Sequence, residues 1–203
     1  MGFNRILINS LILLSFFISC KKEEKSEKVE NDSLIRQQLY RLENVGWKSK
    51  IHTEFIGGIN FSAVEVPVQY YLLKDKGNQD LFLIDSIYQE NKKERIIEFT
   101  FTQEDEEDLL KEKFTTLNYE DGIKYLAFSI DKDFYAVTSK NDTILCSGAQ
   151  YERNFKIAPF QKLILFFSGI EPEEEIQLIY KDKLFGKGII KFQFKDTYTE
   201  IPL

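Results

Sequence analysis

The feature that most constrains this chain is a period-two alternation of apolar and polar side chains in short segments. Near the C-terminus, Ile190, Phe192 and Phe194 alternate with polar residues, and residues 95–102 show a similar pattern. Successive side chains of a β-strand point to opposite faces of the sheet, so this period is typical of strands with one buried face. The pattern therefore favours sheets over helices for most of the chain.

Ten segments are predicted as strands from this alternation or from their β-enriched residues. They are 48–56, 63–73, 81–89, 95–102, 123–131, 134–139, 143–151, 160–168, 175–181 and 188–195. Turn signals at 76–78, 120–122, 140–142 and 186–188 separate several of them. Helices are expected only over about 34–46 and from the acidic run 104–108. The pattern predicts a mainly β fold, an antiparallel β-sandwich or an open barrel with one or two short helices.

Residues 34–203 are expected to form a single β-rich globular domain. The chain of 203 residues contains 18 Phe and 10 Tyr, which is enough apolar material for a substantial core. No Pro/Gly/Ser-rich linker and no repeat divides this stretch. Two small sandwiches joined near 115–122 are the alternative.

The first twenty residues have the parts of a secretory signal peptide. Arg5 precedes an apolar run over 6–18, and charged residues begin at Lys21. A helix over this run would be about 20 Å long, too short for a hydrocarbon core about 30 Å thick. We therefore expect residues 1–19 to be a cleaved signal peptide, with an uncleaved N-terminal anchor as the alternative.

Ser19-Cys20 at the end of the apolar run resembles the lipobox of bacterial lipoproteins. The small residue before the cysteine fits the pattern, whereas Phe17 stands where these proteins usually have Leu. The resemblance implies cleavage before Cys20 and attachment of acyl chains such as palmitate to the new N-terminus. Because two or more chains hold a protein stably on a bilayer, it predicts that Cys20 anchors the chain to the membrane of a bacterial cell envelope.

Residues 21–33 are expected to form a flexible tether after the anchor. Val29 is their only apolar side chain, so they bury too little surface to offset the entropy of ordering. Lys21 replaces the Asp that marks inner-membrane retention in enterobacterial lipoproteins, and the Lys/Glu cluster resembles the surface-export signal of Bacteroidota lipoproteins. These resemblances imply the outer membrane and leave its periplasmic and surface faces both open.

Charge and motifs exclude several classes of function. The chain has 27 Lys+Arg against 33 Asp+Glu, a net charge of −6, which argues against nucleic acid as the partner. It contains no P-loop, Gly-x-Ser-x-Gly, His-Glu-x-x-His or Cys-x-x-Cys motif, and no cofactor is expected. A carboxylate pair would suffice for a glycosidase-type enzyme, so that class stays open behind a non-catalytic binding or structural domain.

The reactive side chains give no catalytic, cofactor-binding or metal-binding prediction. His52, the only histidine, is expected to be exposed on the face opposite Ile51 and Phe55. Cys146 is expected to be a buried apolar residue, and with Cys20 acylated no intramolecular disulfide forms. The acidic runs 104–108 and 171–175 are interpreted as solvated surfaces, because they lack a calcium-loop pattern. The predicted site is therefore Cys20 alone, as the lipidated residue.

Three triplets resemble the Asp-Ser/Thr-aliphatic acceptor of Bacteroidota O-glycosylation. They begin at Asp32, Asp85 and Asp142. Thr143, in a predicted turn, is the favoured acceptor, and Ser86, in a predicted strand, is the least favoured.

Two classes of function fit these observations, and the first has two versions. The leading hypothesis is a lipid-anchored envelope protein whose β-rich domain engages another protein. Residues 66–75 resemble a strand motif of the outer-membrane lipoprotein of type VI secretion, which implies a part in a secretion apparatus. An acidic surface would instead suit an immunity lipoprotein that captures a basic toxin. A surface glycan- or ligand-binding lipoprotein is the alternative class, and it predicts two or three exposed rings in one groove, with Trp47 and several Tyr available.

Overall fold

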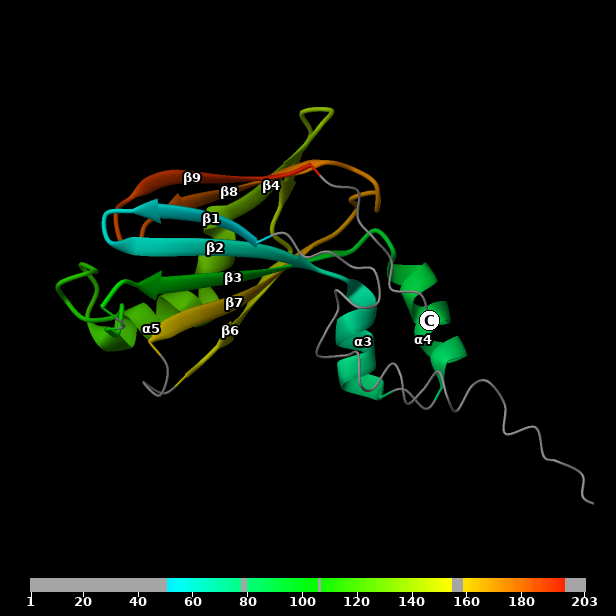
Figure 1. Cartoon of the computed structure of the whole chain (residues 1–203), viewed down its shortest axis with the longest axis horizontal. Coiled ribbons are helices and arrows are strands. Elements are labelled where there is room, and N and C mark those ends of the chain that lie inside the picture. Colours follow the sequence, from blue (N-terminus) through cyan, green and yellow to red (C-terminus); the bar gives the residue numbers. More distant parts are fainter. Residues whose placement is uncertain (1–50, 78–79, 106, 155–158, 196–203) are drawn as a thin grey trace, which may run out of the picture.

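The computed structural model describes residues 51–77, 80–105, 107–154 and 159–195, which form a two-layered β-sandwich (Figure 1). One sheet has five strands in the order β1-β2-β3-β7-β6, and the other has four in the order β5-β4-β8-β9. All neighbouring strands are antiparallel. The predicted fold class, a mainly β antiparallel sandwich, is confirmed.

The element bounds follow the chain in this order. The strands are β1 (Ile51–Ile56), β2 (Ile59–Val66), β3 (Arg95–Gln103), β4 (Phe134–Thr138), β5 (Thr143–Leu145), β6 (Gly148–Glu152), β7 (Phe160–Phe167), β8 (Ile176–Asp182) and β9 (Gly188–Phe194). The helices are α3 (Val68–Lys76), α4 (Leu81–Asn91), α5 (Tyr119–Phe128) and the 3-10 helix η3 (Ile130–Asp133). None of the described helices has the length and apolar character needed to cross a bilayer.

The core lies between the two sheets and is rich in aromatic rings. Phe99 on β3 packs edge-on against Phe101, Phe134 and Phe192, with ring centroids 5.1, 4.9 and 5.3 Å away. Such arrangements add about 0.5–1.5 kcal/mol per pair beyond area burial. The alternation seen in the sequence places one face of each strand in this core. Side chains from before and after residues 115–122 contribute to the same cluster.

The β1–β2 hairpin turns through two glycines with positive φ. Gly57 and Gly58 have φ of 57° and 80°, and they separate the paired residues Ile56 and Ile59. A two-residue hairpin loop of this kind needs left-handed backbone at both positions, which favours glycine. A Cβ on Gly57 would also lie 2.7 Å from Lys187 Nζ. The conformation of this turn therefore depends on glycine at both positions.

The predicted strand 81–89 is wrong, and the predicted strand 63–73 is correct only for residues 63–66. β2 ends at Val66, and Pro67 precedes α3. At α4 the Asp80 carboxylate accepts a hydrogen bond from the Leu83 amide at 3.1 Å and caps the helix. Residues 66–75, which resemble a strand motif of a secretion lipoprotein, are therefore mostly helical.

The prediction also fails between β3 and β4. Instead of a turn at 120–122 and a strand at 123–131, the chain forms α5, capped by Asn118, whose side chain accepts from the Asp121 amide. Gly122 faces the Leu110 side chain in this helix. The helix expected from the run 104–108 does not form, and the described residues there make turns. Residues 143–151 form two strands, β5 and β6, which belong to different sheets.

The remaining predictions concern residues that the structure does not describe. The signal peptide 1–19, the tether 20–33 with Cys20, and the helix expected over 34–46 all lie outside the described ranges.

Candidate binding surface

The five-stranded sheet has two ends that differ in how its strands are connected. At the end we call the helical end, β1 begins, β2 ends, β3 begins and β7 ends. Helices α3 and α4 connect β2 to β3 there (Figure 1). At the opposite end, which we call the loop end, β1 and β2 meet in the two-glycine turn. Within the described ranges, helices cover only the helical half of the sheet's outer face, which is turned away from the sandwich core.

The helical half of the outer face is covered. Ile96 and Ile164 stand on neighbouring strands of this face and are buried beneath Val68 of α3 and Tyr88 of α4. Phe166, two residues along from Ile164, is half-buried in the same cluster. The helices thus provide this half with a second, smaller core.

The loop half of the same face is open and carries two exposed rings. Phe55 on β1 is 60% exposed and Phe160 on β7 is 38% exposed. The register places them in one cross-strand row, Phe55–Asn60–Thr102–Phe160. With strands about 4.8 Å apart, the two rings stand about 14 Å apart across the sheet. We call this row and the next one, Thr53–Ser62–Thr100–Lys162, the loop-end face.

Short polar side chains fill the space between the two rings. Thr53 Oγ1 lies 3.2 Å from Ser62 Oγ, and Thr100 and Thr102 are half-buried beside them. Hydroxyl and amide groups at these positions can donate and accept hydrogen bonds. The loop-end face therefore offers two apolar contact points with adaptable polar groups between them.

A charged network marks the boundary between the two halves. Lys162 Nζ lies 3.0 Å from Glu98 and 3.4 Å from Glu152, and the Tyr71 hydroxyl of α3 donates to Glu98 at 2.5 Å. Burial and the Glu98 hydrogen bond raise the pKa of Tyr71. Burial alone would lower the pKa of Lys162, but its hydrogen bond and attraction to Glu98 raise it. Lys162 therefore stays charged and fixed at the edge of the open half.

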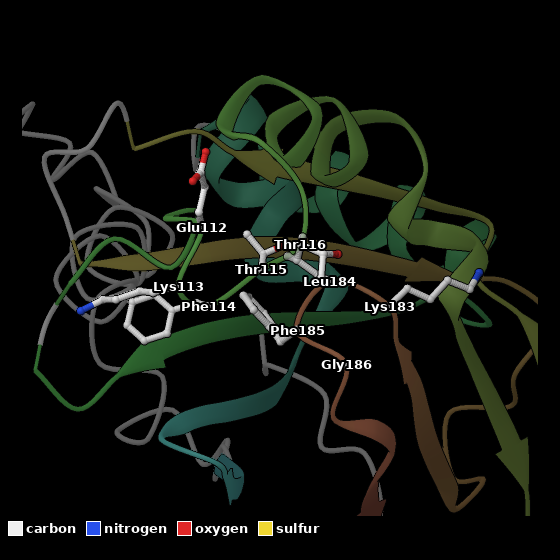
Figure 2. Close-up of a pocket in the computed structure, with 9 residues that line it drawn as sticks. All are labelled: Glu112, Lys113, Phe114, Thr115, Thr116, Lys183, Leu184, Phe185 and Gly186. Carbon is white, nitrogen blue, oxygen red and sulfur yellow. The ribbon is translucent and has the colours of Figure 1, made fainter.

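A pocket of about 250 Å³ also opens at the loop end (Figure 2). Its walls come from the segment after β3 and from the β8–β9 loop: Glu112, Lys113, Phe114, Thr115, Thr116, Lys183, Leu184, Phe185 and Gly186. Figure 2 shows the Lys113 and Lys183 ammonium groups pointing away from its centre, where the Phe185 ring lies. Lys113 pairs with Glu107, and Lys183 with Asp133. The pocket thus suits an apolar group better than an anion.

Two buried carboxylates, Asp133 and Asp182, bind residues that line the pocket. Asp182 accepts from the Tyr180 hydroxyl at 2.9 Å and from the amides of Leu184 and Phe185 at 3.0 Å. Asp133 accepts from the Tyr125 hydroxyl and pairs with Lys183. Burial and these carboxylates raise the pKa of both tyrosines. The cluster holds the β8–β9 loop in place.

The structure contradicts the prediction that His52 is exposed. Ile51 and Phe55 do share a face, as predicted, but they are the exposed residues. The His52 ring lies on the inner side, 4.6 Å from the Phe194 ring, and is half-buried. The pairing of β1 with β2 thus places the apolar face of this edge strand outward, and β9 of the other sheet contacts its inner side.

Cys146 is half-buried where the chain passes from β5 to β6. Its Sγ lies 3.0 Å from the Gly148 carbonyl, and it packs against the core. Burial raises the pKa of this thiol. A raised pKa disfavours the thiolate, which is the nucleophile. The side chain is half-buried, whereas the sequence predicted a buried one.

The acidic runs serve local structure. Glu107 binds Lys111 and Lys113, while Glu174 accepts from the Ser139 amide at 3.0 Å and lies 3.4 Å from Lys140. No group of three or more His, Cys, Asp or Glu suited to a metal occurs in the described part of the chain. Of the glycosylation triplets, Thr143 is exposed in β5, and Ser86 is exposed on α4 rather than within a strand.

Cys20, the single site residue predicted from the sequence, and Trp47 lie outside the described residues. The loop-end face could not be predicted from the sequence, because it depends on the register of the strands. Phe55 and Phe160 are far apart in the chain, and each belongs to a segment with an ordinary strand pattern. Only the pairing of β1, β2, β3 and β7 brings them into one row.

Comparisons with protein-family models, curated proteins and solved structures find no match for this chain.

Proposed function

We propose that this protein is a bacterial envelope lipoprotein, anchored through acylated Cys20, whose β-sandwich binds another protein through the loop-end face. The observation that carries the proposal is the row Phe55–Asn60–Thr102–Phe160, open on a face whose other half is covered by helices. Aromatic rings exposed together on one surface are a mark of protein interaction sites.

The chemistry of the row favours a protein over a sugar. The rings on the face are phenylalanines, which lack the polar handle of Tyr or Trp, and no described tyrosine is fully exposed. Phe55 and Phe160 stand at the two ends of the row, about 14 Å apart, so they do not form one platform on which a sugar ring could stack. Two apolar anchors with hydroxyl groups between them suit a partner that contributes its own side chains and backbone amides.

Charge supports a partner that is not acidic. The whole chain carries a net charge of −6, and Glu98 and Glu152 flank Lys162 at the border of the face. Complementary charge speeds encounter and excludes wrong partners more than it adds affinity. An immunity role against a basic toxin and a role in a secretion assembly are both compatible with this surface, and the identity of the captured protein separates them.

Site-specific crosslinking in intact cells tests the proposal. A photoreactive amino acid replaces Thr102, at the centre of the row, and in a matched control it replaces Lys181 on the outer face of the other sheet. We expect one discrete crosslinked protein from position 102, lost when Phe55→Asp and Phe160→Asp are combined. Phe128→Asp, at a ring that is 78% exposed on α5, should leave it unchanged. No product from position 102, or equal products from both positions, would overturn the binding surface.

The anchor has its own test. Cys20→Ser removes the acylated sulfur, and we expect the variant to leave the membrane fraction while the parent stays in it. Mass spectrometry of the parent should show an N-terminal peptide that begins at an acylated Cys20. An unchanged membrane fraction for Cys20→Ser would contradict the lipoprotein part of the proposal and leave the binding surface standing.

A further inference from the structure

The pocket at the loop end reaches the aromatic core of the sandwich. The Phe185 ring at its centre is 8% exposed, and its centroid lies 5.5 Å from that of Phe101 and 6.1 Å from that of Phe61. A group that enters the pocket therefore meets the edge of the cluster that lies between the two sheets.

A second ring lines the same pocket. Figure 2 shows the Phe114 ring face-on and the Phe185 ring nearly edge-on, so the two rings are inclined to each other. Aromatic pairs prefer offset stacking or an edge-to-face contact. An entering ring can make one of these contacts with each phenylalanine. Leu184, which is buried, completes the apolar part of the wall.

The charged side chains of the rim do not face the interior of the pocket. Lys113 and Lys183 are held in ion pairs outside it. Figure 2 shows the Glu112 carboxylate directed away from the Phe185 ring. Because an ion that leaves water needs a partner of opposite charge, the pocket favours a neutral ligand.

Thr115 supplies one buried polar group to the wall. It is 5% exposed, and its Oγ1 accepts from the Leu117 amide at 3.2 Å. This is the only hydrogen bond of the hydroxyl within the described part of the chain. A hydroxyl has one proton and two lone pairs. The proton and one lone pair are therefore left for a ligand.

The volume of the pocket limits the ligand to one ring system. It measures about 250 Å³. A cavity of about 150 Å³ holds benzene, and pockets for drug-sized molecules measure about 300 Å³ or more. The pocket thus fits a phenol or an indole and is too small for a chain of sugars.

The pocket is preformed, because the β8–β9 loop is fixed. The Asp182 carboxylate accepts hydrogen bonds from the amides of Leu184, Phe185 and Lys187 at 3.0, 3.0 and 2.8 Å. A ligand therefore binds without the entropic cost of ordering this loop.

We propose that the loop-end pocket binds a single neutral aromatic ring that carries a hydrogen-bonding group, such as a phenol or an indole. The ring contacts Phe114 and Phe185, and its polar group bonds to Thr115 Oγ1. A side chain of a bound protein and a free aromatic molecule present the same chemistry. The inference goes beyond the loop-end face and does not depend on the lipid anchor.

Fluorine NMR of small probes added to the purified full-length protein tests the proposal, with the same solution without protein as the blank. 4-Fluorophenol has a ring and a hydroxyl, whereas 4-fluorocyclohexanol has the hydroxyl but no π electrons. We expect 4-fluorophenol to bind tighter by about five-fold or more, because only an aromatic ring pairs with the two phenylalanines. Equal affinities would overturn the aromatic assignment, and no binding of 4-fluorophenol would overturn the pocket as a ligand site.

A substitution of Thr115 tests the hydroxyl. Thr115→Val should weaken 4-fluorophenol by about five-fold and change the affinity for fluorobenzene, which has no hydroxyl, by less than about two-fold. Thr138→Val is the matched control, because Thr138 is also buried and its Oγ1 also accepts from backbone amides. It should change neither affinity. Equal weakening of both probes by Thr115→Val would overturn the role of the hydroxyl.

A blocking substitution shows that the probes bind in this pocket. Thr116 is an exposed residue of the wall, so Thr116→Trp should obstruct the pocket and abolish the binding of 4-fluorophenol and fluorobenzene. Thr143→Trp, at an exposed position on β5, should leave both unchanged. Equal binding by the two variants would place the probes elsewhere and overturn the inference.

The source of the natural ring is identified in intact cells that carry a photoreactive amino acid at position 116. A crosslinked protein that added 4-fluorophenol displaces would assign the ring to a side chain of that protein. A small adduct on the peptide with residue 116, displaced in the same way, would assign it to a free molecule. If neither product forms, the pocket has no ligand in the cell and the proposal is wrong.

Discussion

The two halves of the outer face of the five-stranded sheet use the same strands but have opposite surroundings. On β7, Phe166 contributes to the cluster under α3 and α4, whereas Phe160, on the same face of the same strand, lies in the open. The difference arises because the chain inserts two helices between β2 and β3 at one end and only two glycines between β1 and β2 at the other. An apolar side chain in the covered half is explained by folding. One in the open half stabilises the fold little, which is why we assign it to binding.

The largest effect is expected where a buried charge holds the helical end together. Arg95 pairs with Glu65 and donates from Nη1 to the carbonyls of Glu171, Pro172 and Glu174 at 2.9–3.2 Å. Arg95→Met leaves the Glu65 carboxylate buried without its cation, so the free energy of unfolding should fall by about 3–5 kcal/mol. Urea denaturation of the parent and the variant measures this difference in the free energy of unfolding.

The paired substitution shows whether the isolated charge is the cause. Arg95→Met combined with Glu65→Leu removes both charges, and it should recover part of the stability lost in the single variant, because an apolar pair has no desolvation cost. If the double variant recovers none of the loss, the isolated Glu65 carboxylate is not its cause, and the loss comes from the missing Arg95 contacts with the carbonyls.

The second effect compares two rings on one strand. Phe166→Ala should lower the free energy of unfolding by about 2–3 kcal/mol, because it removes a ring packed beneath the helices. Phe160→Ala should cost about 1 kcal/mol or less, because that ring is partly in water. In the crosslinking assay the order reverses, since only Phe160 belongs to the loop-end face. Equal losses of stability would remove the distinction between the two halves.

The sequence could predict the central strands and could not predict the helices that cover them. β3, β7, β8 and β9 follow from alternation or β-enriched residues, and their predicted bounds agree closely with the structure. Residues 68–73 are apolar on both strand faces, so periodicity alone did not separate strand from helix. Pro67, at the start of α3, and Asp80, which caps α4, are the residues that indicate helices here. For α5 the Asn118 cap and the acidic first turn were visible, but Gly122 was interpreted as a turn signal.

The candidate surface could not be predicted, because it exists only once the register is known. Nothing in the residues around Phe55 or Phe160 distinguishes an open row from a buried one. The burial of His52 could not be predicted either, because it depends on β9 of the other sheet packing against the inner side of β1. The anchor at Cys20 stays a prediction from the lipobox resemblance.

A smaller effect, confined to the loop end, should appear in acid. Hydrogen bonds from Lys111 and Lys113 hold the pKa of Glu107 at about 2, below its ordinary value of 4.5. The folded form therefore binds the proton less readily than the unfolded chain. The stabilisation is complete above about pH 4.5 and is lost as the pH falls towards 2. Glu107→Gln should flatten the pH dependence of stability in this window at low salt, and high salt should weaken the difference. Identical pH profiles for parent and variant would contradict the pairing.

The smallest effect is expected for an exposed ion pair at the helical end. It tests whether the contribution of an ion pair to stability depends on its burial or on its place in the fold. Lys93 Nζ lies 2.6 Å from Glu171 at the same helical end as Arg95, but both side chains are about half exposed. Water and salt screen such a pair, so Lys93→Ala should lower the free energy of unfolding by about 0.5 kcal/mol, an order of magnitude below the expectation for Arg95→Met. The substitution keeps the Lys93 carbonyl that accepts from the Ile170 amide at 3.0 Å, so the backbone of the turn is unaffected. Parallel urea titrations of Lys93→Ala and Arg95→Met compare the two losses in the free energy of unfolding. A loss for Lys93→Ala comparable to that for Arg95→Met would mean that the turn at 171–174 depends on its surface charges as much as on the buried guanidinium.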